Sequence, residues 1–388
     1  MSAAAPAPAA TRRLLAGVRS DGRALSLAEH RRVYGSIEFD HPELIAAVDR
    51  AGLRGCGGGG FPTAQKLAAV RAAGRRSVVV VNAAEGEPVA DKDKVLLGHV
   101  PHLVLDGAVA AARAVRARDV IVGAHPTVVA TVERAVAERS DPKVELHVVA
   151  VPERFVAGEE TALVRYLNGG PALPTFTPPR PFERGVRRLP TLVQNAETLA
   201  HIALIARHGA EWFREVGSPD QPGTTLVTLS GAIRTAGVYE IPTGLPLSRL
   251  LVDAGGVRGD LLAALVGGYF GAWVPARAAD VPLTDAALAR FGAALGARAI
   301  VVLPRGRSGI AATARILRRL ADESAGQCGP CVHGLAAIAD DFERLSRRDK
   351  TVDRNRLERR LAVIAGRGAC RHPDGAVRLA ASALQVFA

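Results

Sequence analysis

The chain is poor in aromatic residues and in cysteine: of 388 residues, 4% are aromatic and four are cysteine. So few aromatic side chains do not make a platform on which successive nucleic-acid bases stack, and no arginine run is interleaved with them. Four cysteines in a chain of this length do not make a disulfide scaffold. We therefore exclude a nucleic-acid-binding protein and a small disulfide-rich secreted protein.

Long uncharged apolar runs are also missing. The longest candidate, residues 261–276, is short and contains three glycines and a proline, so we expect no transmembrane segment. Residues 1–11 lack the charged and then apolar layout of a signal peptide, and we expect a disordered tail over residues 1–20. These features favour a cytoplasmic protein, or one peripheral to a membrane complex.

The residues that are abundant indicate a folded protein of several domains. Apolar residues make up 48% of the chain and charged residues 23%, which suits two or three packed domains. The formal net charge is +12, and nearly all basic residues are arginine. With nucleic acid excluded, the basic excess favours docking to an acidic protein partner.

The most informative segment is residues 55–66, which has glycine at 55 and at 57–60. Without side chains, the backbone N–H groups of such a loop can approach a phosphate or a flat ring. Pro62 and Thr63 then open a predicted helix, whose N-terminus favours an anion, and Lys66 follows about one turn later. The segment predicts a loop that binds a phosphorylated, planar ligand; the alternative is a flexible linker. Cys56 is interpreted as a small space-filler beside the ligand, or as a redox thiol.

The sequence after this loop alternates between strand and helix. Predicted strands lie at 77–81, 119–123 and 144–151, and predicted helices lie at 101–116, 126–138 and 158–167. This alternation predicts an α/β domain with a mostly parallel sheet. Such sheets bind ligands beyond the carboxyl ends of their strands.

The rest of the chain is predicted to hold a small mixed module and a helical bundle. Residues 169–190 are rich in proline and form an irregular connection, and residues 192–208 return to helix. A glycine- and proline-rich stretch at 217–223 is interpreted as a domain boundary. Beyond it we expect strands at 224–230, 237–241 and 299–303, a helix at 247–254, and four amphipathic helices between 310 and 384.

Three polar segments could carry chemistry. Residues 82–88 follow directly on a predicted strand, and Asn82 can donate and accept hydrogen bonds there. By itself this segment could also be an ordinary polar turn. Glu159 and Glu160 open a predicted helix, where simple capping by the helix dipole is the alternative. Residues 194–198 are polar and by themselves uninformative.

The remaining cysteines form a possible metal site. Cys328 and Cys331 are a Cys-x-x-Cys pair, and Cys370 lies further along the chain. This spacing suits iron–sulfur ligation, zinc ligation or a redox dithiol. A [4Fe–4S] cluster normally takes four thiolates, so the flanking His333 and His372 are considered as a fourth ligand, or as ordinary loop residues.

Taken together, the motifs resemble the NADH-binding flavoprotein subunit of respiratory complex I. The related subunits of bidirectional hydrogenases and NAD-dependent formate dehydrogenases share these motifs. The resemblance runs from Gly52 to the C-terminus, and the order of so many separate pieces makes chance similarity implausible. Its motifs are Gly52-Leu-Arg-Gly…Gly-Phe61-Pro-Thr, Asn82-Ala-x-Glu-x-Glu-Pro88, Gly158-Glu-Glu-Thr-Ala-Leu163, Asn195-x-Glu-Thr-Leu199, Phe291-Gly…Leu295-Gly296 and Glu323-Ser324.

The resemblance implies the fold class and the domains. It implies an α/β fold: a Rossmann-like FMN-binding domain, a small β-grasp domain of the soluble-ligand-binding type, and a C-terminal helical bundle. With the tail at 1–20, the expected boundaries are an FMN- and NAD-binding domain at 21–217, the β-grasp module with the following strand at 223–305, and an iron–sulfur-binding bundle at 306–388.

The resemblance also implies the activity and its cofactors. Electrons would pass from NAD(P)H to FMN, from FMN to a [4Fe–4S] cluster, and from the cluster to a ferredoxin-like or thioredoxin-like iron–sulfur partner. The partner would be a separate polypeptide, and the whole could be a larger redox complex.

The family's functional residues carry over onto matching positions of this chain. The implied cofactor-binding residues are Gly55, Gly57, Gly58, Phe61, Lys66, Asn82, Glu85, Gly158, Glu159, Asn195 and Thr198. Glu87 and Glu160 would face the dinucleotide and are the expected catalytic residues. The implied iron ligands are Cys328, Cys331 and Cys370.

The chain also departs from the family's pattern. Cys56 stands where the family has arginine, Ala84 replaces an acid, and Ala69 and Arg180 stand where phenylalanines stack on the adenine. Ala325 replaces the first cysteine of the cluster motif. These departures leave two alternatives open: an assembly subunit, non-catalytic or ferredoxin-coupled, that keeps flavin without binding NADH, and a zinc site at the three cysteines.

Overall fold

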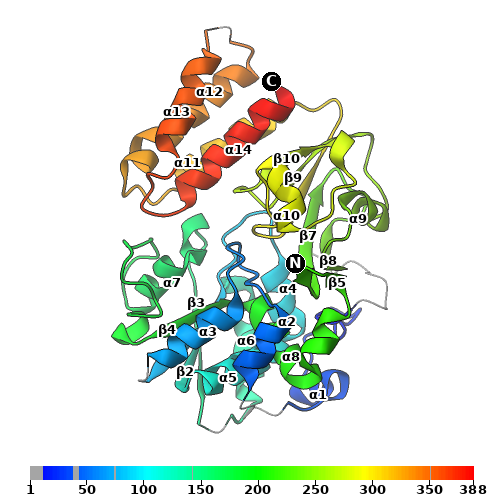
Figure 1. Cartoon of the computed structure of the whole chain (residues 1–388), viewed down its shortest axis with the longest axis vertical. Helices are drawn as coiled ribbons and strands as arrows, with labels where there is room; N and C mark the ends of the chain where they lie inside the picture. The colour runs from blue at the N-terminus through cyan, green and yellow to red at the C-terminus, as the bar shows by residue number, and fades with distance from the viewer. Residues whose placement is uncertain (1–11, 38–42, 74–75, 142, 350) are drawn as a thin grey trace.

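The computed structural model describes residues 12–37, 43–73, 76–141, 143–349 and 351–388. Figure 1 shows three parts: an α/β part at one end of the molecule, a second sheet beside it, and a helical bundle at the opposite end that carries the C-terminus. The fold class predicted from the sequence is confirmed in this arrangement.

The sheet of the α/β part is entirely parallel, with the spatial order β3-β2-β1-β4. Its strands are β1 (Ser77–Ala83), β2 (Ala117–Ala124), β3 (Glu145–Ala150) and β4 (Thr191–Asn195). Val79 and Val81 point into one hydrophobic core, and Val78 and Val80 point into the other. All four are fully buried, because a central parallel strand has helices or loops on both faces.

Helices cover both faces of this sheet. The core on the Val79 side contains residues of α1 (Leu27–Tyr34), α2 (Leu44–Ala51), α3 (Thr63–Ala72), α4 (Lys92–His99), α5 (Pro101–Ala114), α6 (Val129–Ala137) and α8 (Ala196–Arg214). On the Val78 side lie α7 (Glu160–Leu167) and the proline-rich connection after it.

The second sheet is mixed, with the spatial order β10-β9-β11-β7-β8. Its strands β7 and β11 are parallel, and every other neighbouring pair is antiparallel. This order agrees with the expected β-grasp arrangement, with β10 added at one edge. The elements of this part are β5 (Gly217–Ser218), β6 (Gln221–Pro222), β7 (Thr224–Gly231), β8 (Gly237–Pro242), α9 (Leu247–Asp253), β9 (Leu261–Val266), β10 (Ala272–Pro275), α10 (Asp285–Leu288) and β11 (Ala299–Pro304).

Four amphipathic helices form the C-terminal bundle, as the sequence predicts. They are α11 (Gly309–Asp322), α12 (Ala336–Ser346), α13 (Arg354–Ile364) and α14 (His372–Phe387), and a π-helical turn at Pro330–Leu335 leads into α12. Trp273 of β10 joins the bundle to the second sheet. Its Nε1 donates to Thr313 Oγ1 at 2.9 Å, and its ring packs edge-on against Phe387.

Some expectations about local structure were wrong. The helix expected over 192–208 begins only at Ala196, because residues 191–195 pair with β1 as strand β4. The tail expected over 1–20 does not reach residue 20: Leu14 and Leu15 are buried, and their N–H groups donate to Glu240. Residues 1–11 lie outside the described residues.

The apolar run at 261–276 is the antiparallel pair of β9 and β10 in the second sheet. Among the described residues, no single helix is long and apolar enough to cross a membrane. Helices α4 and α5 have the length and apolar composition of a membrane span only when they are taken together, and they are bent by 97° relative to each other.

Candidate functional site

The glycine loop lies at the carboxyl edge of the parallel sheet, next to the end of β4. The main-chain N–H of Cys56 donates to Thr198 Oγ1 at 2.9 Å. A Cβ at Gly57 would lie 3.3 Å from Asn195 Cβ, so the loop rests directly on the start of α8. The fold thus brings together the glycine loop and the polar segment 194–198, which are far apart in the sequence.

Internal hydrogen bonds hold the loop in one conformation. Gly55 N–H donates to the carbonyl of Phe61, and Arg54 Nε donates to the carbonyl of Gly60. Gly58 and Gly60 have φ values of 109° and 57°, a region that residues with a Cβ rarely adopt. These contacts argue against the flexible-linker interpretation.

Helix α3 begins at Thr63, and Pro62 precedes it without a side-chain cap. Lys66 lies in the first turn, and its Nζ contacts Glu160 Oε2 at 2.7 Å. Both side chains are partly exposed, and Phe61 at the end of the loop is 55% exposed. An ammonium group, a helix N-terminus without a side-chain cap and an exposed ring therefore lie within one short segment.

The acidic segment before α7 joins the same edge. Asn82 Nδ2, at the end of β1, donates to the carbonyl of Gly158 at 2.8 Å. Glu159 caps α7 by accepting hydrogen bonds from the N–H groups of Thr161 and Ala162. Burial raises the pKa of Glu159, although these hydrogen bonds oppose the rise. The capping interpretation of Glu159 is thus confirmed, while Glu160 pairs with the glycine-loop lysine.

A buried polar network that the sequence reasoning missed supports Asn195. Lys92 Nζ donates to Asn195 Oδ1 at 2.9 Å and to Asp93 Oδ1 at 2.8 Å, and Asn195 Nδ2 donates to Asp93 Oδ2 at 2.6 Å. Glu85 accepts the N–H groups of Asp93 and Lys94 at the start of α4. Burial, with the neighbouring Asp93, raises the pKa of Glu85 to about 8. The charged run at 91–94 was the available signal, because such a run directly after a ligand loop can turn inward.

Glu87 points toward the second sheet rather than into the glycine loop. Its Oε2 accepts the N–H of Tyr269 at 2.9 Å. Its Oε1 is buried and has no hydrogen-bond partner in the described part of the chain. Burial raises the pKa of Glu87 to about 7. A carboxyl with one unpartnered oxygen and a pKa near neutrality is typical of a functional site.

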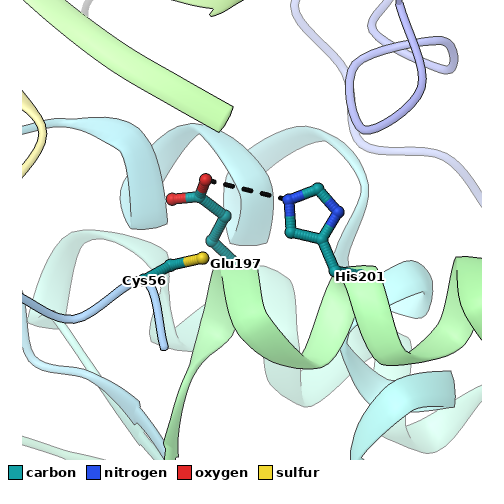
Figure 2. Close-up of side chains that lie close together, drawn as sticks. All are labelled: Cys56, Glu197 and His201. Carbon is teal, nitrogen blue, oxygen red and sulfur yellow. Dashed lines mark ion pairs between the residues drawn. The ribbon is translucent and has the colours of Figure 1, made fainter. Parts of the chain in front are cut away.

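Figure 2 shows the side chains of Cys56, Glu197 and His201 close together. Their possible ligand atoms all lie within 4.8 Å of one another. This set could be interpreted as a metal site, but Glu197 already has other partners. Its carboxylate accepts from Thr225 Oγ1 and from the N–H of Leu226, and it lies 3.2 Å from Lys92 Nζ.

The charges around Glu197 also oppose a metal ion. Arg298 Nε lies 3.6 Å from Glu197 Oε1. The positive guanidinium group therefore occupies the side of the carboxylate that a divalent cation would need as a ligand. Although burial opposes it, Lys92 and Arg298 lower the pKa of Glu197 to about 2. Burial raises the pKa of Cys56 to about 12, which favours the neutral thiol. The space-filling interpretation of Cys56 fits this environment better than the redox-thiol interpretation.

The three remaining cysteines come together beside the bundle, and none of them forms a disulfide. The thiols of Cys328 and Cys331 lie close enough to interact with each other, and Cys370 lies close enough to interact with both. Main-chain N–H groups lie near each sulfur: those of Ala369 and Cys331 near Cys328, that of Gly326 near Cys331, and that of His372 near Cys370. Sulfurs that receive N–H groups fit the thiolate ligands of an iron–sulfur cluster.

The two histidines considered as a fourth ligand differ in position. His333 is exposed. His372 is buried, and its Nε2 is 2.7 Å from the carbonyl of Leu320 at the end of α11. Its ring packs edge-on against Phe155 and Phe270, with centroid distances of 5.4 Å and 5.2 Å.

This aromatic contact joins all three parts of the molecule. Phe155 comes from the α/β part, Tyr269 and Phe270 come from the second sheet, and His372 comes from the bundle. The rings of Phe155 and Phe270 are 4.8 Å apart, and Phe155 stacks on Tyr269 at 6.4 Å. Since Tyr269 N–H binds Glu87 and His372 N–H lies near Cys370, the rings lie between the acidic loop and the thiols.

The described residues fit both cofactors that the resemblance implies. Three features suit FMN: the glycine loop without side chains, the N-terminus of α3, and Lys66. The backbone of the loop can approach the flat ring, and the helix N-terminus and the ammonium group favour the phosphate. The thiols with their N–H donors suit an iron–sulfur cluster. The fold places the predicted residues along one path, from the glycine loop to Cys370.

Comparison with known proteins agrees with this geometry. The family model described as Nuo51 FMN-binding domain matches residues 48–204, and the one described as NADH-ubiquinone oxidoreductase-F iron-sulfur binding region matches residues 311–388. An F subunit of NADH-quinone oxidoreductase from Rhizobium meliloti is 32% identical, over 95% of this chain and 93% of its own. The F subunit from Mycobacterium tuberculosis is 33% identical, over 89% of this chain and 83% of its own.

A solved structure is also similar. A chain of an NAD+-reducing [NiFe]-hydrogenase in the H2-reduced state matches with a TM-score of 0.81 and 33% identity. The match covers 90% of this chain and 62% of that longer chain. Sequence, fold and site geometry therefore agree, and the chain belongs to the family of the NADH-quinone oxidoreductase F subunits, with an FMN-binding domain and a 4Fe–4S region.

Proposed function

We propose that this chain is an electron-transfer oxidoreductase subunit that takes electrons from NAD(P)H and passes them, through FMN and an iron–sulfur cluster, to a partner protein. FMN, when bound, accepts a hydride and releases its electrons one at a time. The contribution of this chain is to bind the flavin and the dinucleotide, to keep them oriented, and to hold the cluster nearby.

The observation that carries the proposal is the convergence at Lys66. A glycine loop with backbone N–H groups, the N-terminus of α3, which has no side-chain cap, and an ammonium group 2.7 Å from Glu160 lie at the carboxyl edge of a parallel sheet. We assign the phosphate of FMN to this corner. Asn82 and Asn195 then lie at the strand ends beside it, with Lys92 and Asp93 holding Asn195 in one orientation.

We assign the dinucleotide to the side of Glu87, Glu160 and Phe61. Phe61 is 55% exposed, and Phe176, which the sequence reasoning did not single out, is 76% exposed. Phe176 follows Thr175, whose N–H donates to Thr161 Oγ1 in α7, so this ring is attached near Glu160. An exposed ring at either position offers a stacking surface in place of the aromatics replaced by Ala69 and Arg180.

We assign the exit of electrons to the side of the bundle. Glu87, the rings of Phe155 and Tyr269, and Cys370 connect the acidic loop to the thiols through the contacts described above. The relatives are named as subunits of NADH-quinone oxidoreductase, and the similar structure is a hydrogenase. For this chain we accordingly propose a larger redox complex on the cytoplasmic side, with a ferredoxin-like or thioredoxin-like iron–sulfur protein as the partner. The net charge of +12 suits an acidic partner.

The test is anaerobic spectroscopy of the purified chain. Bound flavin, iron and sulfide are measured first, and NADH or NADPH is then added in separate samples. We expect a flavin absorbance band that bleaches with one of the two nucleotides, followed by a reduced-cluster signal in low-temperature EPR. A chain that binds no flavin after reconstitution would overturn the proposal.

The lack of aromatic residues at two positions favours a second candidate function. Arg180 is exposed and Ala69 is half-buried, so neither position offers an aromatic ring for adenine. In this alternative the chain is an assembly subunit that keeps flavin, is non-catalytic or ferredoxin-coupled, and does not bind NADH. Flavin that is bound but bleaches only with reduced ferredoxin or dithionite, and with neither nucleotide, would support the alternative.

A further inference from the structure

The chain has one cysteine fewer near the bundle than a four-thiolate cluster requires. Of its four cysteines, Cys56 lies in the glycine loop, 3% exposed, with its Sγ 3.6 Å from the carbonyl of Arg54. Its main-chain N–H is bonded to Thr198, so this residue belongs to the flavin side of the molecule. Cys328, Cys331 and Cys370 remain, whereas [4Fe–4S] clusters take four cysteine thiolates as a rule.

The segment that leads into the thiols offers no replacement ligand. Ala325 and Gly326 have no side-chain donor, and the N–H of Gly326 already lies near Cys331 Sγ. The amide of Gln327 is engaged with the α/β part: its Nε2 donates to the carbonyl of Pro174 at 2.8 Å, and its Oε1 accepts from Arg165 at 3.2 Å.

The nearby carboxylates have structural partners as well. Glu323 Oε2 accepts the N–H of Phe155 at 3.3 Å, and Glu323 Oε1 lies 3.5 Å from Arg319 Nη2. Two acidic residues interact with Cys370, Glu159 and Asp374. Glu159 is bonded to the first turn of α7. Asp374 Oδ1 accepts the N–H of Gly366 at 2.7 Å, and its Oδ2 lies 3.1 Å from Arg371 Nη1. To ligate iron, any of these carboxylates would have to break its contacts.

His372 is the strongest competitor for the fourth position. Its Nε2 is committed to the carbonyl of Leu320, and its ring is packed between Phe155 and Phe270. Its Nδ1 is buried and has no hydrogen-bond partner among the described residues. A direct test must therefore separate a histidine-completed cluster from one without a fourth protein ligand.

We propose that this chain binds its [4Fe–4S] cluster through three thiolates only, leaving one iron without a protein ligand and exchangeable. The inference deepens the proposed function and rests on its assignment of the cluster to these cysteines. One-electron oxidation by an added oxidant such as ferricyanide converts [4Fe–4S]²⁺ into [3Fe–4S]⁺ and releases one Fe²⁺. One electron from dithionite together with added Fe²⁺ reverses the step, so charge and iron both balance.

The experiment uses the whole chain, purified without oxygen and, if iron is low, reconstituted with iron and sulfide. Ferricyanide is added stepwise, and released Fe²⁺ is measured with a ferrous chelator while EPR follows the three-iron cluster. We expect release of one iron per cluster, and recovery of the four-iron cluster with dithionite and Fe²⁺. Retention of all four irons, or binding of zinc without sulfide, would overturn the inference.

Two variants place a thiol before the cluster motif. In Ala325→Cys the thiol stands at the position of the missing ligand, and we expect iron release to slow at least tenfold. In the matched control Ser324→Cys, one residue earlier, release should match that of the parent chain. Equal release from both variants would contradict the assigned position of the open iron.

His372→Ala addresses the competitor. Because we assign His372 to packing, the variant should release iron as the parent chain does. A parent that keeps its iron while His372→Ala loses it would assign the fourth ligand to the histidine and overturn the inference. Flavin absorbance and its bleaching by nucleotide are recorded on the same samples, so a failure of the proposed function is seen independently of iron release.

Discussion

Lys66 Nζ lies 2.7 Å from Glu160 Oε2, joining the first turn of α3 to the first turn of α7. The two residues are far apart in the sequence, and both side chains are partly exposed, at 24% and 31%. The pair holds a cation beside the glycine loop while leaving it accessible. A phosphate that binds there meets an ammonium group that is already positioned.

The first prediction concerns this ammonium group. Lys66→Met removes one charged hydrogen bond to the flavin phosphate, which contributes about 1.5–3 kcal/mol. We expect the dissociation constant of FMN to rise about 10- to 100-fold, measured by titration of flavin fluorescence with the flavin-free chain. Glu160→Gln should leave FMN affinity unchanged or stronger, because it frees Lys66 from its carboxylate.

The control for this titration is Lys143→Met, which removes an exposed lysine before β3, away from the glycine loop. FMN affinity of this variant should equal that of the parent chain. Equal weakening in both lysine variants would mean that only net charge matters, and the assignment of Lys66 would be wrong.

The second prediction concerns the buried carboxylate of Glu197. Glu197→Gln removes the carboxylate beside the buried Arg298 and leaves Lys92 with Asp93 as its charged partner. Breaking a buried ion pair from one side costs about 3–5 kcal/mol, so the free energy of unfolding should fall by that amount in urea. The matched variant Glu358→Gln breaks an exposed pair with Arg354 and should cost less than about 1 kcal/mol. A similar loss in both variants would argue against the buried network.

The third prediction concerns the pH dependence of stability through Glu87. Burial raises its pKa from 4.5 to about 7, so the folded chain holds the proton more tightly than the unfolded chain. The stability that this group contributes is therefore complete below pH 4.5 and is lost as the pH rises through 7.

Glu87→Gln removes this dependence and keeps an acceptor for the N–H of Tyr269. From pH 5 to pH 8, its free energy of unfolding should rise relative to that of the parent chain, by roughly 3 kcal/mol at most. Urea unfolding at several pH values measures the difference. The exposed control Glu145→Gln should show no such trend, and a flat difference for Glu87→Gln would refute the raised pKa.

The fourth prediction concerns thiol reactivity. Because burial raises the pKa of Cys56 to about 12, its thiolate fraction at pH 8 is very small. With the cluster removed, iodoacetamide should label the half-buried Cys328 and leave Cys56 unlabelled in the native chain. Peptide mass spectrometry measures the labelling, and unfolding in urea should expose Cys56. Native labelling of Cys56 at the rate of Cys328 would contradict its buried, neutral state.

Much of the fold was predictable because it follows local patterns. The apolar run at 77–81 predicts a buried strand, and the structure extends it only to Ala83. The helical spacing after residue 310 predicts four helices, and four are found there. The expected helix over 192–208 was wrong at its start because apolar residues 192–193 are equally suited to a strand, and only pairing with β1 decides between them.

The candidate site was predictable in part. The glycines at 57–60 and Lys66 predict a ligand-binding loop from their residue types alone. Lys92 and Asp93 carried only a weak signal, their place directly after a ligand loop, because a run of alternating charges is usually exposed. Their burial beside Asn195 depends on contacts between segments about 100 residues apart, which no local pattern contains.

The amino-acid sequence by itself determined which chemistry this chain can carry: a side-chain-free loop with a lysine, acidic segments at strand ends, and three thiols in the C-terminal part. The tertiary structure alone decided which of these groups meet. It pairs Lys66 with Glu160, directs Glu87 to Tyr269, and places His372 Nε2 against the carbonyl of Leu320. The physical reason is that a charge or a hydrogen-bonding group in a folded protein is defined by its partners, and those partners come from distant segments that only packing brings together.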